Sequence, residues 1–355
     1  MAINIASFNL YTFSSAKNRQ NLKSFDKIAS IINNSNADLV ALQEVIDQQS
    51  VDSLLSQLHG ICGVRRRWRA FFDKKKTHRN NREGYAFLWD EGVVELARDD
   101  NGDAIEPEIM TRYASLKRPP MVGRFRTVRG MEYEICVINT HIIFKKDRYL
   151  NAQAHPEWYS ARAMRALEYS KIVREIYPTF ATHLNVYAVI AGDYNLSLGT
   201  LMKINELGNQ KNDRPQMITV QRAETTIKVI DLYERDDDVQ EPEPSSKEQQ
   251  GFLFGIFNGV LSIFAKREQK KIPFQGKDRS VLCGQSLLID GGYAHDYDHF
   301  SFDMARVAPY VRNPHRISIS ETMFPLPQHR FHDYKADVSD HVPIVATLDL
   351  SSSLK

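Results

Sequence analysis

Residues 186–195 have the sequence VYAVIAGDYN, an apolar run that ends abruptly in a glycine, an aspartate, a tyrosine and an asparagine. The run has the length and the β-branched content of a short buried strand. Asp193 and Asn195 therefore stand at the end of a predicted strand, where a carboxylate is costly unless it is paired, hydrogen-bonded or bound to a metal. This stretch predicts buried strands with a polar site at their ends.

The same pattern recurs on both sides of this stretch. Apolar runs typical of strands cover Ile3–Asn9, Asp38–Val45, Tyr85–Trp89, Tyr133–Thr140, Val186–Gly192 and Val342–Leu350. Apolar residues at helical spacing run from Leu22 to Ile32 and stop at the breaker Asn33–Asn36. Residues 157–177 lack Gly and Pro and are bracketed by Pro156 and Pro178, which predicts a second helix. Strands that alternate with helices indicate an α/β protein.

The composition is that of an ordinary globular protein. Of 355 residues, 42% are apolar and 25% charged, which is enough for a sizeable core. A net charge of only +2 means that any surface for nucleic acid must be local. Three cysteines without a CxxC pair argue against a disulfide framework, and the first residues lack a signal-peptide pattern. No apolar run is long enough to span a bilayer, so we expect a cytoplasmic protein.

Polar side chains are concentrated at the ends of the apolar runs. They are Asn9, the pair Gln43–Glu44, and the groups 139–141, 193–195 and 339–341. Carboxylate and amide oxygens suit a hard divalent cation, and two nearby histidines suit proton transfer around a phosphate. Each element alone has an ordinary explanation, since a glutamate after an apolar run is usually a surface residue and GDYN can be a turn. SDH before the last strand can likewise be a cap.

Taken together and in this order, the motifs SFN, LQE, NTH, GDYN and SDHVP resemble those of the endonuclease/exonuclease/phosphatase superfamily, also called deoxyribonuclease I-like. The resemblance extends over residues 3–350. It implies an α/β fold, a four-layered sandwich of two mixed β-sheets packed face to face with helices outside. It also implies one domain over residues 1–355 that hydrolyses phosphodiester bonds with Mg²⁺ or Mn²⁺, at an edge of the sandwich where loops from both sheets meet.

The resemblance assigns roles to the matching positions. It implies that Glu44 is the principal metal ligand, that Asn9 helps to bind metal or phosphate, and that Asp340 is a second ligand. The residues implied to act on the phosphate or on the attacking water are His141, Asp193, Asn195 and His341. Asp298, in the predicted strand DYDHFSF, would orient His341. The residues leave open which histidine acts as acid and which as base, because such a pair can titrate as one unit.

Three further segments are similar to deoxyribonuclease I itself: IASFNLYTF, NREGYAFLW and LKRPPMVGRF. They imply that Glu83 is the partner of His141 and that Arg118 contacts the substrate phosphate. A carboxylate behind each imidazole would fix its tautomer and raise its pKa. The alternative for Glu83 and Arg118 is a surface ion pair without a role in chemistry.

Other positions depart from particular members of the superfamily. The arginine and tyrosine that enter the DNA minor groove in deoxyribonuclease I fall at Ile46 and Asn81, which leaves the mode of duplex binding open. Phe8 and Tyr11 stand where abasic-site endonucleases carry a Trp and an acidic residue, and the motifs of inositol polyphosphate 5-phosphatases are missing. We therefore favour a nuclease acting on DNA. A lipid phosphodiesterase of sphingomyelinase type and an inactive scaffold on the same fold are the alternatives, and RNA remains open as a substrate.

Residues 65–82, RRRWRAFFDKKKTHRNNR, combine many basic side chains with aromatic ones. Cations can neutralise phosphates and aromatic rings can stack on bases, so we expect Arg65, Arg66, Arg67 and Arg69 to bind substrate. The segment leads directly into Glu83, which predicts that it lies near the catalytic edge. The alternatives are a solvated loop with its aromatic side chains in the core, and contact with anionic lipid.

Residues 234–283 are predicted to be an insertion within the single domain. An acidic stretch, typical of a flexible linker, precedes an apolar helix over 252–265 and a basic run. The helix is too short to span a membrane. We expect its apolar face to pack on its own domain or to mediate self-association, with membrane contact as the less favoured alternative.

Overall fold

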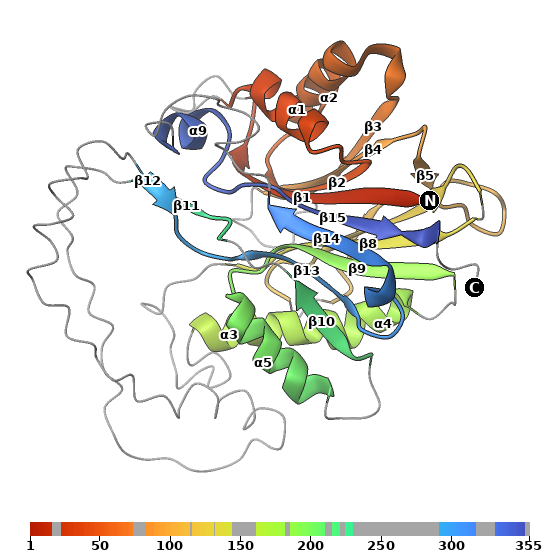
Figure 1. Ribbon diagram of the computed structural model, residues 1–355, viewed down its shortest axis with the longest axis vertical. Coiled ribbons are helices and arrows are strands. Elements are labelled where there is room, and N and C mark those ends of the chain that lie inside the picture. Colours follow the sequence, from red (N-terminus) through yellow and green to blue (C-terminus); the bar gives the residue numbers. More distant parts are fainter. Residues whose placement is uncertain are drawn as a thin grey trace, which may run out of the picture.

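The structure is a computed structural model, and it describes residues 1–15, 23–73, 83–113, 116–130, 132–143, 161–181, 185–209, 215–220, 224–229, 291–316 and 331–351. Within these ranges two β-sheets pack against each other, and helices cover the outer face of each sheet (Figure 1).

The first sheet is built around the amino-terminal strand. Its order is β14 (Val311–Arg316), β15 (Ile344–Asp349), β1 (Ala2–Phe13), β2 (Leu39–Val45), β4 (Gly84–Asp90) and β3 (Trp68–Asp73). β1 and β2 are parallel, while the other neighbours are antiparallel, so the sheet is mixed.

The second sheet is built around β9, the strand of the GDYN motif. Its order is β10 (Met217–Val220), β13 (Asp298–Asp303), β9 (Val186–Asp193), β8 (Glu134–His141), β7 (Met121–Thr127) and β5 (Val94–Leu96), with β6 (Glu108–Ile109) also paired to β7. β8 and β9 are parallel. A separate ribbon joins β11 (Ile227–Val229) to β12 (Gly291–Tyr293).

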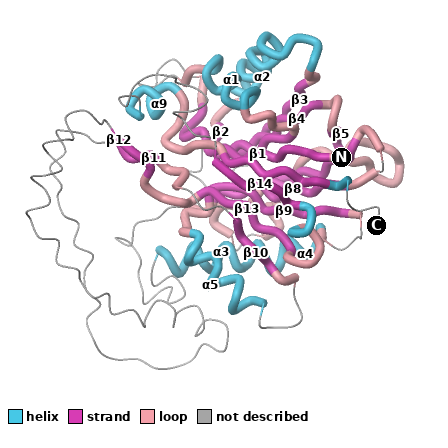
Figure 2. The backbone as a smooth tube through the Cα atoms, viewed as in Figure 1, coloured by secondary structure: helices cyan, strands magenta, loops and turns pink. Residues whose placement is uncertain are grey.

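Helices form the two outer layers (Figures 1 and 2). On the first sheet lie α1 (Phe25–Asn34), α2 (Gln48–Cys62), which runs into a 3-10 turn at Gly63–Arg65, and α9 (Phe331–Asp337). On the second lie α3 (Ala161–Lys171), the π-helical turn η4 (Ile172–Ile176), α4 (Tyr177–Phe180) and α5 (Leu198–Asn209). A short 3-10 turn, η6 (Ala308–Tyr310), precedes β14.

Apolar side chains of both sheets fill the space between them. Ile5, Leu39, Val137, Val189 and Phe300 belong to this buried cluster, and each is at most 3% exposed. Two further clusters lie between each sheet and its helices. The predicted α/β sandwich of two mixed sheets with helices outside is therefore confirmed.

All six predicted strands are present, with ends shifted by a few residues. The described part of the predicted helix over 157–177, which begins at Ala161, is helical and continues through Pro178 to Phe180. A proline cannot donate to the carbonyl four residues back, and the π-helical turn immediately before α4 relaxes this requirement. Pro178 then occupies the first turn of α4, where a missing N–H is tolerated.

Two other sequence expectations concern cysteines and membrane spans. Cys62 and Cys136 are buried free thiols, while Cys283 and the predicted helix over 252–265 lie outside the described residues. Within the described ranges, none of the helices has the length and apolar character needed to cross a membrane.

Candidate active site

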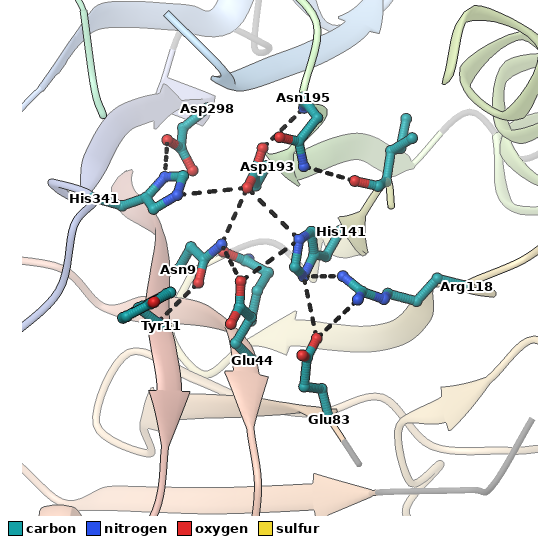
Figure 3. Close-up of polar contacts among 12 residues, drawn as sticks. Asn9, Tyr11, Glu44, Glu83, Arg118, His141, Asp193, Asn195, Asp298 and His341 are labelled. Carbon is teal, nitrogen blue, oxygen red and sulfur yellow. Dashed lines mark hydrogen bonds and ion pairs between the residues drawn. The ribbon is translucent and has the colours of Figure 1, made fainter. Parts of the chain in front are cut away.

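The carboxyl ends of the two parallel strand pairs meet at one edge of the sandwich. β1 and β2 bring Asn9 and Glu44 there, and β8 and β9 bring His141 and Asp193. The antiparallel neighbours begin at the same edge, because Asp298 of β13 is in register with Asp193. Figure 3 shows the resulting polar cluster of Asn9, Tyr11, Glu44, Glu83, Arg118, His141, Asp193, Asn195, Asp298 and His341.

Both strands of the first sheet are irregular at this edge. The pairing of β1 shifts between Asn9 and Phe13, and that of β2 with β4 shifts between Gln43 and Val45. Tyr11, Thr12 and Glu44 have positive φ angles of 45°, 55° and 59°. Bulges of this kind change the direction of a side chain, and here the Thr12 N–H donates to Glu44 Oε2 at 3.0 Å. Such backbone strain is commonly found at functional sites.

Asn9 links the two sheets through its fully buried amide. Its Nδ2 donates to Glu44 Oε1 at 3.1 Å and to Asp193 Oδ2 at 3.0 Å. Its Oδ1 accepts the Tyr11 N–H at 3.0 Å. The amide nitrogen rather than the oxygen therefore faces the carboxylates, so in this geometry Asn9 orients Glu44 and Asp193 and does not offer an oxygen to a metal.

Asp193 lies at the centre of the cluster and is 2% exposed. Its Oδ1 accepts the N–H of Asn195 at 2.8 Å, and Asn195 in turn donates its Nδ2 to the Ile142 carbonyl at 2.7 Å. Burial raises the pKa of Asp193 to about 7, although the charge of His341 opposes the shift and that of Asp298 adds to it. Asp193 can therefore exchange a proton near neutral pH.

The glycine of the GDYN motif permits this arrangement. Gly192 has a φ of 150°, and a Cβ at this position would lie 1.8 Å from the Thr140 carbonyl oxygen of β8. Only glycine allows β9 to come this close to β8, and this approach sets Asp193 in register with His141.

His341 is held by Asp298. Its Nδ1 donates to Asp298 Oδ2 at 2.8 Å, and its Nε2 lies 3.6 Å from Asp193 Oδ2. Burial by itself would lower the pKa of His341, but the nearby carboxylates of Asp298 and Asp193 raise it well above the usual value. The contact between Asp298 and His341 implied by the resemblance is present, and it keeps this imidazole cationic.

His141 has the opposite environment. Arg118 hydrogen-bonds its Nδ1, and Glu83 Oε2 lies 3.9 Å from that nitrogen but 2.8 Å from Arg118 Nη2. Burial, the guanidinium and then His341 lower the pKa of His141 well below its usual value. The expectation that Glu83 raises the pKa of His141 is wrong, because Arg118 lies between them and pairs with the carboxylate. The Nε2 of His141 is 3.7 Å from both Glu44 Oε1 and Asp193 Oδ2.

Two buried side-chain amides connect the two sheets next to the site. Gln43 Nε2 donates to Asn139 Oδ1 at 2.7 Å, and Asn139 Nδ2 donates to the Leu42 carbonyl at 3.0 Å. Both side chains are fully buried, and they belong to different sheets. They fix the separation of β2 and β8 one or two residues before Glu44 and His141.

Two sets of side chains could hold a divalent cation. Glu44, Glu83 and His141 offer ligand atoms within 4.8 Å of one another. The resemblance implied instead Glu44 and Asp340, with help from Asn9, and Asp340 Oδ1 is buried without a hydrogen-bond partner among the described residues. Glu44 is common to both sets. We favour the second set, because a cation between Glu83 and His141 would lie against the Arg118 guanidinium.

The four arginines expected to bind substrate lie elsewhere. β3 runs antiparallel to β4, so Trp68 faces Asp90 at the end of the sheet remote from Glu83. Arg66 pairs with Asp38 and Asp90, and Arg69 with Glu91. Arg65 and Arg67 are exposed at that same remote end. The expectation that this part of the basic segment lies near the catalytic edge is wrong, because β3 carries the chain across the sheet before it reaches Glu83.

The aromatic side chains of this segment also differ from expectation. Trp68 is 1% exposed and packs in the core, and Phe71 and Phe72 pack against the buried clusters. They are therefore not free stacking platforms. The remaining basic residues of the segment, from Lys74 to Arg82, lie outside the described residues.

Two residues at the edge were not recognised as site residues. Tyr11 is 37% exposed beside Asn9 (Figure 3), and Lys23 Nζ lies 5.2 Å from the centre of its ring. Burial lowers the pKa of Lys23 to about 8, while the charges of Asp340 and Glu44 act in the opposite direction. Nothing in the local sequence of Lys23 marks it, since it precedes α1 in a stretch of mixed polar residues.

Comparisons with known proteins agree with this architecture. The model of the endonuclease/exonuclease/phosphatase family matches residues 4–213, more than half of the chain. No curated protein matches the sequence significantly. The solved endonuclease/exonuclease/phosphatase from Bacteroides vulgatus is similar with a TM-score of 0.51 and 14% identity, covering 99% of this chain and 100% of that chain. This likeness supports the fold alone.

Two further solved structures are similar over most of their length. D. rerio TDP2 complexed with single-strand DNA product has a TM-score of 0.49 and 13% identity, covering 98% of both chains. The human Nocturnin catalytic domain with bound sulfate has a TM-score of 0.46 and 14% identity, covering 98% of this chain and 93% of that chain.

Proposed function

This chain belongs to the endonuclease/exonuclease/phosphatase family, and from that premise we propose that it is a metal-dependent phosphodiesterase that cleaves DNA. One observation carries the proposal. The Nε2 atoms of two histidines with oppositely shifted pKa values lie 3.6 and 3.7 Å from the same oxygen of Asp193. Such a pair can stabilise an anion and transfer a proton within one small site.

The donor set fits Mg²⁺ or Mn²⁺. Burial, together with the charge of Glu83, raises the pKa of Glu44, so this carboxylate lacks full compensation from the protein. Asp340 Oδ1 is likewise buried without a hydrogen-bond partner among the described residues. Glu44 and Asp340 would hold the cation, which when bound supplies Lewis-acid stabilisation of the charge that grows on the phosphate.

Side chains of the protein carry out the proton transfers and the contacts to the phosphate. Asp193, with its pKa near neutrality, accepts a proton from the attacking water, and the Asn195 N–H keeps its carboxylate oriented. His341, kept protonated by Asp298, donates to an oxygen of the phosphate or to the leaving oxygen. Burial and the Arg118 guanidinium, which hydrogen-bonds Nδ1, keep His141 neutral, and His141 presents an Nε2–H to the phosphate. The Asn9 amide keeps Glu44 and Asp193 apart at a fixed distance.

DNA as the substrate rests on sequence detail. IASFNLYTF, NREGYAFLW and LKRPPMVGRF are similar to segments of deoxyribonuclease I. The geometry supports a shared site for two of these segments, because Arg118 hydrogen-bonds His141 and pairs with Glu83.

Activity assays with matched variants test the proposal. Purified protein is incubated with plasmid DNA, linear DNA, RNA and sphingomyelin, in Mg²⁺ and in EDTA. We expect DNA cleavage only in Mg²⁺, and a loss of about 100-fold or more in Glu44→Gln and in Asp193→Asn. Glu91→Gln is the control, because this glutamate pairs with Arg69 at the remote end of the sheet. Undiminished cleavage in EDTA, or hydrolysis of sphingomyelin alone, would contradict the proposal.

A further inference from the structure

Tyr11 occupies an unusual position for a large side chain. It lies directly after Leu10 on the irregular part of β1, has a φ of 45° and keeps 37% of its surface exposed. The Tyr11 N–H donates to Asn9 Oδ1 at 3.0 Å. The ring lies beside Asn9 and Glu44 at the catalytic edge (Figure 3). A left-handed tyrosine costs free energy, so the fold maintains an aromatic ring at the rim of the site against a local preference for another conformation.

Lys23 holds this ring. Its ammonium lies over the Tyr11 ring at 5.2 Å from the centre and donates to the Lys335 carbonyl of α9 at 3.1 Å. The side chain is only 5% exposed, and among the described residues no carboxylate forms an ion pair with it. A buried ammonium is costly, and its attraction to the π-face of an aromatic ring offsets part of that cost. The lysine therefore connects α9 to the ring and restricts where the ring can lie.

The Tyr11 ring lies where the base of a nucleotide next to the cleaved phosphate would bind. The ring lies beside Asn9 and the proposed cation ligand Glu44 (Figure 3), and the Tyr11 N–H donates to Asn9 Oδ1, so the ring is close to where the scissile phosphate would bind. Aromatic rings beside a backbone-binding groove commonly stack on bases without regard to sequence. Trp68 of the basic segment cannot serve this purpose, because it is buried in the core.

We propose that Tyr11 stacks on the base of the nucleotide next to the scissile phosphate and that Lys23 is a positioning residue for its ring. The inference rests on the proposed function, because it requires a nucleic-acid substrate. It adds a specificity-determining contact on the Glu44 side of the site, where a substrate without an aromatic base would lose affinity.

Two oligonucleotides of the same length separate stacking from backbone binding. One is oligothymidylate, and the other has the same backbone with tetrahydrofuran residues in place of every nucleoside. Stacking contributes about 1–3 kcal/mol per base, which is roughly 5- to 150-fold in binding. We expect Tyr11→Ala to raise KM for oligothymidylate by at least about 5-fold with kcat little changed, and to leave KM for the abasic oligonucleotide unaltered. Tyr11→Phe keeps the ring and should match the unaltered protein.

Lys23 is tested by rescue. Lys23→Met removes the cation and should raise KM for oligothymidylate in the same direction as Tyr11→Ala, whereas Lys23→Arg should restore it. Val64→Ala, at a side chain that is 99% exposed near the remote end of the sheet, is the control for an exposed apolar substitution. Binding measured by fluorescence anisotropy in EDTA gives a second readout that does not depend on turnover.

The outcomes distinguish the two proposals. If the unaltered protein cleaves neither the oligonucleotides nor plasmid DNA, the proposed function fails and this inference fails with it. If it cleaves plasmid DNA but neither binds nor cleaves oligothymidylate, the stacking subsite alone is wrong. If it cleaves oligothymidylate but Tyr11→Ala behaves like Tyr11→Phe, the stacking subsite alone is wrong. Equal losses on the two oligonucleotides would also overturn it, because the ring would then act on the backbone or on the shape of the site rather than on a base.

Discussion

The two buried histidines of the site differ in the charges that surround them. Each has a carboxylate in reach, but Asp298 hydrogen-bonds His341 directly while Arg118 lies between Glu83 and His141. The same residue type is therefore cationic in one place and neutral in the other. At the scale of single residues, the order of charges around an imidazole decides its protonation more than the presence of a nearby carboxylate does.

Removal of the Asp298 charge should shift the titration of His341. With Asp298 present, the folded-state pKa of His341 is raised, so the imidazole loses its proton only at a pH well above its usual range. In Asp298→Asn that support is lost while burial remains, and we expect the pKa to fall and the alkaline limb of kcat to move to lower pH. NMR titration of the imidazole Cε1–H in EDTA measures the shift.

The stability of the protein should follow the same linkage. A histidine whose pKa is raised by folding stabilises the fold below its unfolded-state pKa, and this contribution is lost as the pH rises through the folded-state value. Asp298→Asn should therefore lose more stability at pH 6 than at alkaline pH. Equal losses at both would mean that the Asp298 carboxylate and the His341 charge are not coupled.

At the scale of elements, the close approach of β8 and β9 sets the geometry of the site. The two strands are parallel and in register from Glu134 with Val186 to His141 with Asp193. Near the end of this ladder the Thr140 carbonyl occupies the space that a Cβ of residue 192 would need. The pairing therefore depends on one glycine, Gly192, near the end of β9 and at the start of the GDYN motif.

Gly192→Ala should disrupt this ladder. The added Cβ would lie 1.8 Å from the Thr140 oxygen, so the strands must separate where His141 and Asp193 face each other. We expect a loss of about 2 kcal/mol or more in unfolding free energy and a large loss of activity. Urea denaturation and DNA cleavage measure both.

Gly199→Ala is the matched control, because a Cβ at this position in α5 meets no atom within 4 Å. Alanine is also the better helix former, so this variant should be neutral or slightly stabilising. If Gly192→Ala behaved like Gly199→Ala, the close approach would not be needed to keep the strands in register.

At the scale of the whole molecule, the basic residues of 65–69 and the catalytic edge lie at opposite ends of one sheet. β4 separates them, with Glu83 before its first residue and Asp90 at its last, a span of roughly 20 Å at about 3.4 Å per residue. Charges so far apart are weakly coupled at physiological salt, where the screening length is about 8 Å.

Arg65→Gln and Arg67→Gln should therefore leave the salt dependence of DNA cleavage unchanged. Arg66→Gln should instead destabilise the fold, because Arg66 pairs with Asp38 and Asp90, both mostly buried. KM measured between 50 and 200 mM salt, roughly the range over which phosphate contacts change affinity most, tests the first expectation. A flatter salt dependence in the Arg65 and Arg67 variants would mean that these arginines contact the DNA after all.

The role predicted for 234–283 stays a prediction, since this segment lies outside the described residues. The segment follows β11 and precedes β12 in the chain. Val229 of β11 pairs with Gly291 of β12, so the residues that flank the segment are adjacent. The ribbon adjoins the site, because the Val342 N–H donates to the Thr225 carbonyl at 2.9 Å. An insertion within one domain is thus geometrically possible.

A deletion that keeps the ribbon tests this role. Replacement of residues 236–270 by a short Gly/Ser linker should preserve hydrolysis of small diesters and alter solubility, oligomeric state or activity on long substrates. Loss of cleavage of even a minimal diester, with far-UV circular dichroism and melting temperature retained, would mean that the insertion supplies part of the active site.

The sequence by itself determined the strands and the chemistry at their ends. Apolar runs such as 186–192 indicate buried strands, and the polar residues directly after several of them suggest a shared polar site. Motif order then indicated the fold family and the set around Glu44, Asp193 and His341. These inferences are local, because each depends on the periodicity and residue types of one short segment.

Only the tertiary structure decided which of these groups touch. Arg118 pairs with Glu83 and hydrogen-bonds His141, and Asn9 turns its amide nitrogen to both carboxylates. Lys23 lies over the Tyr11 ring and donates to the Lys335 carbonyl of α9. β3 takes Arg65 to the far end of the sheet although Glu83 follows it closely in sequence. Such contacts depend on strand direction, register and bulges, which arise from the packing of the two sheets and not from the pattern of any one segment.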